Sequence, residues 1–561
     1  MAVKKNYQFW PEGVERHINY PEIPAFEILR SSARKWPERN AIIFQEKETT
    51  YRELDSLSDR FAAALAKLGV GKGHRVGIHL PNSPQFAIAY FGILKAGAVF
   101  VPISTMLAEK ELSFLLRDAG VETYIGLDSA FKEKYSALSG TPVRRVILVG
   151  PSTETPAVKS SPLETWDLAA LLKDSAPSPP RIDFNPREDL AHIAYTGGTT
   201  GTPKGAMITH YNVVVNTCQY LCWFAGGVLT YRNGIIDIQR REGDREEDHL
   251  LLPGRETVLV VSPWFHAMGV IGYVNRLLVL GATIVVFPRF DPEEFLRAIP
   301  RYRPTFFGGA PPLFIPLIEH PLYRDTDMSG IKAVGSGAAT LSPSLISTLE
   351  EKFPRRIYEG YGMTEATMGA VNSPPTPTIW RPGSVGLPIP DTEIKIVDPE
   401  NGEAELLIGE AGEICIRGPQ VMKGYLNRPE ETAQVLRSGW LYSGDIGRMD
   451  EDGFLYIVDR KKDMLIYKGY NVYPRDLEET LNSHPAVAQS AVVGKKDPRS
   501  GELPVAFVRL VPGKTATEQE LIEYANQRLA AYKKIRILKI VEALPVSAAG
   551  KILKRELKKI V

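Results

Sequence analysis

An eleven-residue stretch, Tyr195–Gly205, has the composition of a loop that binds a polyphosphate. It reads YTGGTTGTPKG, with four glycines, four threonines and one lysine, and it follows the mostly apolar run Leu190–Ala194. Glycines let a loop turn its backbone N–H groups toward a ligand, threonine hydroxyls donate to phosphate oxygens, and Lys204 adds a positive charge. It is not a Walker A loop, in which Ser or Thr follows the lysine, because Gly205 follows Lys204. Taken alone, such a stretch is also typical of a polar surface turn.

A second candidate site is Gly360–Glu365, which reads GYGMTE. The two glycines allow Tyr361 to lie flat against a planar base, while Thr364 and Glu365 offer hydroxyl and carboxylate oxygens. A carboxylate near a triphosphate is useful mainly through Mg²⁺, which prefers oxygen ligands and bridges phosphates. The alternative interpretation is a helix N-cap with a glutamate in its first turn.

Residues suited to a ribose lie in Tyr442–Asp445, which reads YSGD, and in Val458–Asp463, which reads VDRKKD. Asp445 could accept hydrogen bonds from both ribose hydroxyls, and Arg460 could donate to the same sugar. The alternative is an aspartate in a turn and a solvated run of charges. Near the end of the chain, Pro545–Ile552 reads PVSAAGKI and has a lysine after a glycine, which is unremarkable by itself.

A weaker motif is Ser262–Gly269, which reads SPWFHAMG. A histidine on such an apolar stretch, here His266, is more often a core residue than a catalytic one. Together, however, the motifs resemble those of the adenylate-forming superfamily: acyl-CoA synthetases, beetle luciferases and the adenylation domains of peptide synthetases. The resemblance rests on TGGTTGTPKG, the YGxTE motif and their order, covers about residues 20–555, and is greatest to a fatty-acid–CoA ligase. At the usual tail motif, P-x-T-x-S-G-K, this chain has Ser547 in place of the Thr and Ala549 in place of the Ser.

The resemblance implies a site for ATP, with Mg²⁺ held near Thr196 and Glu365. The residues implied in ATP and AMP binding are Thr196, Gly197, Gly198, Thr199, Thr200, Gly201, Lys204, Gly337, Ala338, Glu359, Gly360, Tyr361, Gly362, Thr364, Asp445, Arg460 and Lys551. Those implied in catalysis are Lys551, Lys204, Thr364, Glu365 and His266. Those implied in acyl and coenzyme A binding are His266, Gly337, Lys468 and Gly469, and the implied hinge of a mobile C-terminal domain is Lys462.

The reaction that the resemblance implies has two halves. A carboxylate attacks the ATP α-phosphate to give an acyl-adenylate and pyrophosphate, and coenzyme A then displaces AMP to give acyl-CoA. We expect Lys551 to hold the carboxylate near the α-phosphate, and rotation about Lys462 to replace it by the hairpin that contains Gly469. An apolar pocket with room at its mouth is predicted from His266, Met268, Gly269, Gly308, Gly309 and Gly337. Such a pocket fits a medium- or long-chain fatty acid, with an aryl acid of the benzoate or 4-coumarate type as the alternative.

Other functions on the same frame are less consistent with the residues. A peptide-synthetase adenylation domain pairs its substrate amine with an acidic residue, and Ser262–Tyr273 contains none. No carrier domain is expected after Lys551. An added oxidative step, as in luciferase, stays open but is not required. A binding protein without turnover is disfavoured because Lys204, Glu365 and Arg460 are all present.

The composition is that of an ordinary globular protein. The 561 residues are 44% hydrophobic and 24% charged, and the net charge of +1 gives no field that would attract nucleic acid. Cys218, Cys222 and Cys415 are expected to be reduced thiols of a cytoplasmic protein. We expect no targeting signal and no transmembrane segment. The expected partners are a carboxylic acid, ATP and coenzyme A, and a homodimer is left open.

These motifs need a frame to position them, and the alternation of helices with short β-branched runs predicts an α/β fold. We expect a large N-terminal domain, residues 1–460, whose last part, about 383–458, is a small β-barrel. A small mobile α+β domain, residues 461–561, follows. The Pro-, Ser- and Thr-rich stretch 150–188 is predicted to be an exposed connection, and the charged segment 232–257 a solvated loop.

Overall fold

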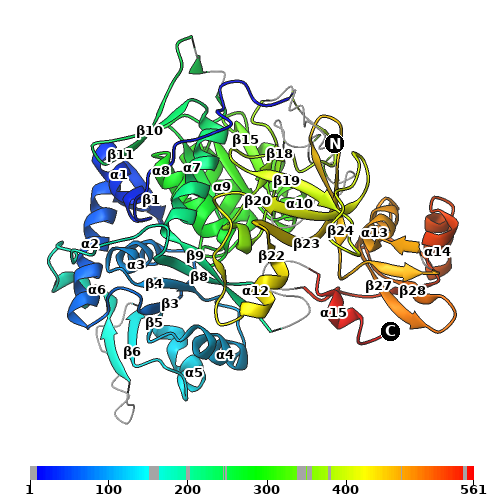
Figure 1. Ribbon diagram of the computed structural model, residues 1–561, viewed down its shortest axis with the longest axis horizontal. Helices are drawn as coiled ribbons and strands as arrows, with labels where there is room; N and C mark the ends of the chain where they lie inside the picture. The colour runs from blue at the N-terminus through cyan, green and yellow to red at the C-terminus, as the bar shows by residue number, and fades with distance from the viewer. Residues whose placement is uncertain are drawn as a thin grey trace.

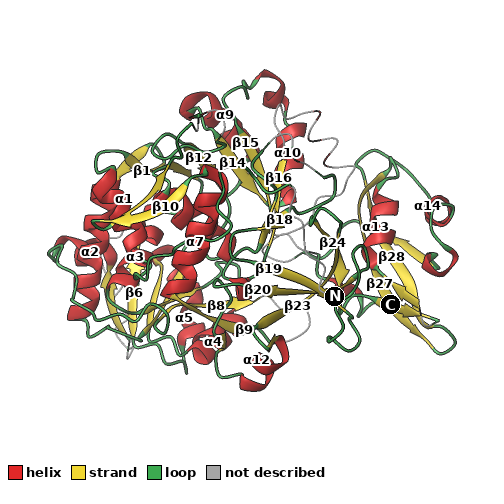
Figure 2. Ribbon diagram, turned by 45° about the horizontal axis from the view of Figure 1, so that its top comes forward, coloured by secondary structure: helices red, strands yellow, loops and turns green. Residues whose placement is uncertain are grey.

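The computed structural model has a large body of mixed α/β structure and a smaller C-terminal unit (Figure 1). It describes residues 9–150, 163–196, 202–243, 245–246, 249–337, 357–376, 379, 381–468, 470–546 and 552–561, together with positions 346, 349 and 351. Two large sheets form the body, and a five-stranded sheet lies between them and the C-terminal unit (Figures 1 and 2). The predicted α/β class with a separate C-terminal part is therefore confirmed.

The first large sheet has the strand order β21-β9-β8-β4-β3-β5-β6-β7. Strands β3 to β8 are parallel where they pair, and β9 and β21 add antiparallel strands at one edge. Two of its helices begin at hydroxyl caps: the Thr50 hydroxyl accepts from the Glu53 N–H at α2, and the Ser83 hydroxyl accepts from the Phe86 N–H at α3. The strands are β3 (Arg75–His79), β4 (Val99–Pro102), β5 (Thr123–Leu127), β6 (Arg145–Val149), β7 (Glu164–Asp167), β8 (Leu190–Thr196), β9 (Lys204–Thr209) and β21 (Gly424–Tyr425). The helices are α2 (Tyr51–Lys67), α3 (Pro84–Lys95), α4 (Glu109–Ala119), α5 (Asp128–Leu138) and α6 (Leu168–Lys173).

The second large sheet has the order β18-β17-β16-β15-β14-β12-β13-β1-β2, and its strands from β16 to β1 are parallel where they pair. Helix α7 packs between the two sheets, against β8 and β9 on one side and helices η2 and α8 on the other. All its residues except Tyr211 are buried, and its polar side chains Asn212, Asn216 and Gln219 donate hydrogen bonds to backbone carbonyls there. The strands are β1 (Asn40–Phe44), β2 (Lys47–Thr50), β12 (Thr257–Val260), β13 (Thr283–Val286), β14 (Phe306–Gly309), β15 (Ala333–Ser336), β16 (Ile357–Tyr361), β17 (Val371–Asn372) and β18 (Leu387–Pro388). The helices are α1 (Glu27–Lys35), α7 (His210–Ala225), η2 (Met268–Asn275), α8 (Arg276–Val279), α9 (Pro292–Tyr302), η3 (Pro311–Leu313), α10 (Phe314–Glu319), η4 (Pro321–Asp325) and η5 (Thr364–Ala366).

Two smaller sheets complete the chain. The five-stranded sheet has the order β19-β20-β23-β22 with β24 paired to β23, and the C-terminal sheet has the order β26-β25-β28-β27 with β29 paired to β28. The C-terminal unit has its own core, which includes Leu477, Val492 and Leu521. The elements of the first are β19 (Glu393–Val397), β20 (Gly412–Arg417), α12 (Pro429–Val435), β22 (Leu436–Arg437), β23 (Trp440–Met449) and β24 (Leu455–Arg460). Those of the second are β25 (Leu465–Tyr467), β26 (Tyr470–Val472), α13 (Pro474–Asn482), β27 (Val487–Asp497), β28 (Gly501–Leu510), α14 (Glu518–Asn526), η6 (Ala531–Lys533), β29 (Ile537–Ile540) and α15 (Lys554–Leu557).

Two stretches predicted to be irregular contain regular structure, so those predictions are wrong in part. Within 150–188, β7 forms an edge of the first sheet and α6 follows it. Within 232–257, β11 (Ile235–Gln239) pairs with β10 (Val228–Arg232) through a turn at 233–234. Both turn residues, Asn and Gly, have positive φ, and this pair strongly favours a tight hairpin. Within the described part of the chain, no helix has the length and apolar character needed to cross a membrane.

Candidate active site

Several predicted site residues lie at the carboxyl edge of the second sheet. Strands β14, β15 and β16 are parallel neighbours, with Gly309 opposite Ser336 and Ser336 opposite Glu359. Gly337 follows β15 directly and donates its backbone N–H to Gly309 O at 3.1 Å. The motif Gly360–Glu365 runs from the end of β16 into η5. This edge is where open α/β sheets bind their ligands, so the fold brings these two distant segments to one candidate site.

The predicted phosphate loop is the turn of a β-hairpin. Strands β8 and β9 pair antiparallel, with Thr196 directly opposite Lys204. The turn residues Gly197, Gly198, Thr199, Thr200 and Gly201 lie outside the described residues. Lys204 Nζ lies 4.9 Å from the centroid of the Tyr425 ring, a distance at which the ring attracts the charge. The ammonium group is thereby held at the end of the hairpin where the turn begins.

Glu365 connects this hairpin to the second sheet. Its side chain is 7% exposed, and its Oε1 accepts a hydrogen bond from the Tyr425 hydroxyl at 2.6 Å. Since Tyr425 lies on β21, which pairs with β9, three distant parts of the chain meet in the group Lys204, Tyr425 and Glu365. Burial raises the pKa of Glu365, whereas the hydrogen bond from Tyr425 and the charge on Lys204 act to lower it. Thr364 begins η5 directly before this carboxylate.

The predicted ribose residues lie together. Asp445 on β23 is the register partner of Arg460 on β24, and Asp445 Oδ1 lies 3.5 Å from Arg460 Nε. Asp445 Oδ2 accepts a hydrogen bond from the Tyr361 hydroxyl at 2.9 Å. Burial and the charge on Asp445 raise the pKa of Tyr361, so that its phenol stays neutral and donates. The YGxTE and YSGD motifs are therefore joined by one direct side-chain contact.

The histidine motif lies beside the end of β15. The backbone N–H of His266 donates to Pro263 O at 3.1 Å, in the turn that leads into η2. On the first turn of η2, Met268 Sδ lies 3.0 Å from the position that a Cβ on Gly337 would occupy. The side chains of η2 thus approach the same strand end as the YGxTE motif.

The prediction that the glycines of this region leave room for a substrate is wrong at two of them. A Cβ on Gly269 would lie 1.9 Å from Pro263 O, and one on Gly308 would lie 2.6 Å from the Tyr273 hydroxyl. These two glycines allow η2 to pack closely against its own entry turn and against β14. Any acyl pocket here is therefore narrower than the sequence suggested.

The residues implied in the second half-reaction lie in or next to the C-terminal unit. Lys462 is exposed in the turn after β24, and partial desolvation together with the charge on Arg460 lowers its pKa. Lys468 is in the turn between β25 and β26, with φ at +51°, and its backbone N–H donates to Ser500 O at 2.8 Å. Ala338, Gly469 and Lys551 lie outside the described residues.

The sequence did not reveal the groups that support the phosphate hairpin. Besides Tyr425, these include Asp118 at the end of α4, whose Oδ2 accepts from the Tyr195 hydroxyl at 2.7 Å. The second oxygen of Asp118 accepts from Arg428 Nη2 at 2.9 Å. Asp118 and Tyr195 are 77 positions apart, and Asp118 and Arg428 are 310 apart, so no local pattern could have indicated the group.

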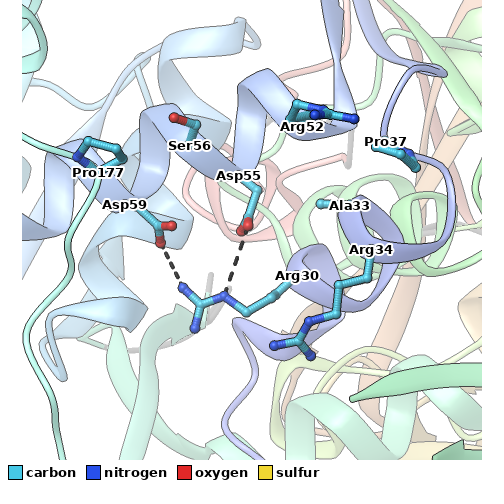
Figure 3. Close-up of a pocket in the computed structure, with 9 residues that line it drawn as sticks. All are labelled: Arg30, Ala33, Arg34, Pro37, Arg52, Asp55, Ser56, Asp59 and Pro177. Atoms are coloured by element: carbon cyan, nitrogen blue, oxygen red, sulfur yellow. Dashed lines mark hydrogen bonds and ion pairs between the residues drawn. The ribbon is translucent and has the colours of Figure 1, made fainter. Parts of the chain in front are cut away.

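A polar cavity of about 550 Å³ lies over α1 and α2, away from this edge of the sheet (Figure 3). Arg30 lies toward Asp55 and Asp59 in it, with Nη2 2.7 Å from Asp59 Oδ1. The buried Lys95 also binds both carboxylates. The cavity is lined by Arg30, Ala33, Arg34, Pro37, Arg52, Asp55, Ser56, Asp59 and Pro177. These opposite charges satisfy one another, which indicates a structural network that joins α1, α2 and α3.

Both parts of the chain match known families. Residues 29–426 match the family described as AMP-binding enzyme, and residues 476–551 match the AMP-binding enzyme C-terminal domain. The chain belongs to the AMP-binding enzyme family. A long-chain-fatty-acid–CoA ligase of Bacillus subtilis is 37% identical to this AMP-binding enzyme over 98% of its length and 96% of the relative. A 4-coumarate-CoA ligase 1 of Narcissus pseudonarcissus is 34% identical over 96% of this chain and 93% of the relative.

Solved structures of the family have the same fold as this AMP-binding enzyme. ATP-bound MatB from Rhodopseudomonas palustris superposes with a TM-score of 0.83 at 26% identity and covers 96% of this chain and 99% of its own. The o-succinylbenzoate coenzyme A synthetase MenE from Bacillus subtilis, in complex with ATP and magnesium ion, has a TM-score of 0.77 at 29% identity and covers 96% and 100%. With these relatives, the AMP-binding enzyme is an AMP-forming acid–thiol ligase.

Proposed function

We propose that this enzyme activates a medium- or long-chain fatty acid as acyl-AMP with release of pyrophosphate, and then forms acyl-CoA and AMP. The observation that carries the proposal is the group of Lys204, Tyr425 and Glu365 beside the glycine-rich turn. It combines a cation, a hydroxyl and a buried carboxylate, as a metal-bridged triphosphate requires. A fatty acid is proposed because the Bacillus subtilis relative is named a long-chain-fatty-acid–CoA ligase.

In the first half-reaction, the hairpin residues 196–204 hold the β- and γ-phosphates, with Lys204 as their cation. Asp445 and Arg460 hold the ribose, and the hydrogen bond between Asp445 and Tyr361 fixes the ring of Tyr361 for contact with the adenine. No side chain acts as a nucleophile, because the substrate carboxylate itself attacks the α-phosphate. The protein supplies position and charge, which are the main catalytic terms in reactions of this kind.

The residues present fit Mg²⁺. Glu365 supplies a buried carboxylate oxygen, and Thr196, opposite Lys204 in the hairpin, supplies a hydroxyl. Within the described residues, no group of three or more His, Cys, Asp or Glu side chains is placed to hold a metal ion, so phosphate oxygens and water provide the other ligands in this proposal. When bound, the ion neutralises charge on the triphosphate.

The second half-reaction is assigned to the C-terminal unit, with a boundary between residues 460 and 461 and Lys462 as the hinge. The position of Lys462, in a turn between β24 and the first strand of the C-terminal sheet, supports this assignment. Rotation about it withdraws Lys551 after adenylate formation and brings the hairpin of Lys468 and Gly469 to the acyl-adenylate. The thiol of coenzyme A then attacks the acyl carbon and AMP leaves.

An aryl acid is the second candidate substrate. A 4-coumarate-CoA ligase is nearly as similar to this chain as the fatty-acid ligase.

The test measures pyrophosphate release and thioester formation with ATP, Mg²⁺ and a panel of carboxylic acids, with and without coenzyme A. We expect pyrophosphate and thioester with straight-chain acids of medium or long chain length, and AMP in equal amount to the thioester. Thioester with aromatic acids alone would favour the second candidate. Adenylate without thioester, or no turnover with any acid, would contradict the proposed function.

A further inference from the structure

Arg276, the first residue of α8, is a buried cation to which the described residues offer no carboxylate. The residue is 6% exposed, and the hydrogen bond of its side chain goes from Nε to Gly272 O at 2.9 Å. Its guanidinium carbon lies 5.0 Å from the ring centroid of Phe224, 5.4 Å from Phe306 and 6.0 Å from Tyr273. Buried charges in proteins are normally paired, so this arrangement requires an explanation.

The aromatic rings compensate the charge only in part. A cation is attracted to the face of an aromatic ring, but this attraction is weak compared with the hydration that a guanidinium loses on burial. Burial accordingly lowers the pKa of Arg276. By contrast, the buried Lys95 of α3 binds two carboxylates and a hydroxyl. The protein thus neutralises one buried cation completely and leaves the other without an anion among its described residues.

Arg276 lies on the helix face that approaches the candidate active site. Because η2 is a π-helix, with i→i+5 bonding, Met268, Gly272 and Arg276 at four-residue spacing do not fully align but still lie toward one side of the continuous η2–α8 helix. Met268 approaches Gly337 at the strand end, and a Cβ on Gly272 would lie 2.9 Å from Met368 Sδ, four residues after Thr364. Helical side chains point toward the N-terminus of their helix, and the bond to Gly272 O shows that Arg276 does so. Its charge is therefore directed toward the end of the helix that borders the site.

Two phenol hydroxyls accompany the guanidinium. Tyr220 of α7 and Tyr273 of η2 are both buried, and burial raises the pKa of each to about 12 although the charge on Arg276 acts to lower it. Both phenols are therefore neutral near pH 7 and can donate hydrogen bonds. A cation with two neutral hydroxyls is a set of groups suited to an oxygen anion.

We propose that the acyl group of the substrate carries a second carboxylate at its far end, which pairs with Arg276. This inference rests on the proposed function and specifies its substrate class as an α,ω-dicarboxylic acid. Four to eight residues separate Met268 from the level of the guanidinium, which is at most about 6–12 Å, because the π-helix η2 rises less per residue than an α-helix. Three bonds of an extended chain span about 3.5 Å, so the two carboxylates should be about five to ten bonds apart. Diacids of about six to eleven carbons have this length.

The first experiment needs only the unaltered enzyme. Thioester formation with ATP and coenzyme A is compared for diacids of six to twelve carbons, their mono-methyl esters, and monocarboxylic acids of equal length. We expect kcat/KM for the best diacid to exceed that for its half-ester by about tenfold or more, because only the diacid neutralises Arg276. Equal or higher kcat/KM for the monocarboxylic acids would overturn this inference and leave the proposed function intact. No thioester from any acid would instead refute the proposed function.

The second experiment replaces Arg276 by methionine, which keeps the length and apolar stem of the side chain. We expect Arg276→Met to lower kcat/KM for the diacid by about a hundredfold, mainly through a higher KM. The kcat/KM for the monocarboxylic acids should change by less than about threefold. The matched control is Arg297→Met on α9, where the arginine is exposed and pairs with Glu293. This variant should leave kcat/KM unchanged for both diacids and monocarboxylic acids. An equal loss on every acid, with lower thermal stability, would mean that Arg276 is structural and would overturn the inference. If the variant does not fold, the comparison of diacid and half-ester in the unaltered enzyme decides the question.

Discussion

The residues assigned to the two half-reactions are held in very different ways. Glu365 is buried and tied by Tyr425 to the hairpin of Lys204, so the triphosphate site joins three distant parts of the chain. The hairpin around Lys468 is instead exposed, with Tyr470 58% exposed, and β25 pairs with β26 and with β28 of its own sheet. One set is built into the body and the other is carried on a separate unit.

This difference suits the order of the reaction. Stabilising charge on a triphosphate requires donors that are fixed before the reaction, because reorganising them would raise the barrier. Presenting a thiol to the finished adenylate requires a part that arrives later, as conformational steps in enzymes often provide. Near the predicted hinge, side-chain contacts cross between the two parts: Lys461 Nζ lies 2.7 Å from Glu413 Oε2, Arg475 Nη1 donates to Ile457 O at 2.8 Å, and the Arg475 N–H donates to Asp459 Oδ2 at 2.9 Å.

The largest effect is expected from Lys551→Ala, which tests whether the C-terminal unit also contributes to the first half-reaction. Removing the charge that holds carboxylate and α-phosphate together should slow adenylate formation by about 10²–10³-fold. Thioester formation from a supplied acyl-adenylate should be unchanged. Pyrophosphate release and thioester formation, measured separately, check both parts of the prediction.

The control for this lysine is Lys559→Ala, an exposed residue of the same tail that pairs with Glu556. It should leave both half-reactions unchanged. If Lys551→Ala slowed both half-reactions by the same factor, the division of labour between the two parts of the molecule would be wrong.

The next effect is expected from Glu365→Gln in the fixed part. The amide keeps the size of the side chain but removes the charge that balances the metal, so adenylate formation should fall by about a hundredfold. The thermal stability of the variant, by contrast, should not fall. Because burial raises the folded-state pKa of Glu365, this carboxyl stabilises the fold below its unfolded pKa and loses that contribution as pH rises through the folded value. The variant should therefore melt at an equal or higher temperature at pH 7.

Glu256→Gln gives the matched comparison. Glu256 is fully buried and accepts from Lys332 at 2.8 Å and from the Leu252 N–H at 2.7 Å, outside the candidate site. Its replacement should lower the melting temperature and leave the rate of adenylate formation unchanged. A lower melting temperature with normal activity for Glu365→Gln would show that Glu365 has only a structural role.

The sequence predicted the regular parts of the fold where local signals agree. The helices Glu109–Ala119 and Pro292–Tyr302 both have acidic residues in their first turn, which is a local signal of a helix start. The second begins with Pro at its first position after Asp291, whose side chain accepts from the Glu294 N–H, and both features mark a helix start. The hairpin at 228–239 was not predicted, although Asn233 and the glycine after it are a strong turn signal. The run of charges that follows led to the prediction of a solvated loop.

The sequence could not predict which side chains complete the site. The motifs around Lys204 and Glu365 were found from their own composition, and each lies on a strand end or hairpin that a local pattern can indicate. Tyr425 lies 60 positions beyond Glu365 and makes its contact only because β21 pairs with β9. The close packing at Gly308 also depends on Tyr273 of another element. Contacts of this kind follow from tertiary pairing, which leaves no periodic trace in one sequence.

Tyr425→Phe tests the fixed site in another way, because it removes the hydrogen bond to Glu365 and leaves the charges of Glu365 and Lys204 in place. Loss of a hydrogen bond to a charged group is worth about 1.5–3 kcal/mol, so adenylate formation should fall by about 10–100-fold. Since the Tyr425 hydroxyl acts to lower the pKa of Glu365, its loss should raise that pKa and move the acidic limb of the pH–rate profile to higher pH. Tyr456→Phe, which removes a similar contact to Asp450 at 3.0 Å, should leave the profile in place. An unmoved profile in both variants would exclude Tyr425 as a positioning residue.

The smallest effect is expected at the junction, from Lys461→Ala. This lysine is 40% exposed in its side chain and binds the buried Glu413, which also accepts from the Gly444 N–H at 3.1 Å. An ion pair with one exposed partner contributes about 1 kcal/mol or less, so the balance between the two positions of the C-terminal unit should shift by up to about fivefold. We expect slower adenylate formation and faster thioester formation from supplied acyl-adenylate. Lys533→Ala, which breaks a pair with Asp476 inside the C-terminal unit, should change neither rate. Slower adenylate formation with faster thioester formation would show that the pair of Lys461 and Glu413 holds the C-terminal unit in the position for adenylate formation. Equal changes in both rates would mean that this pair contributes to stability alone.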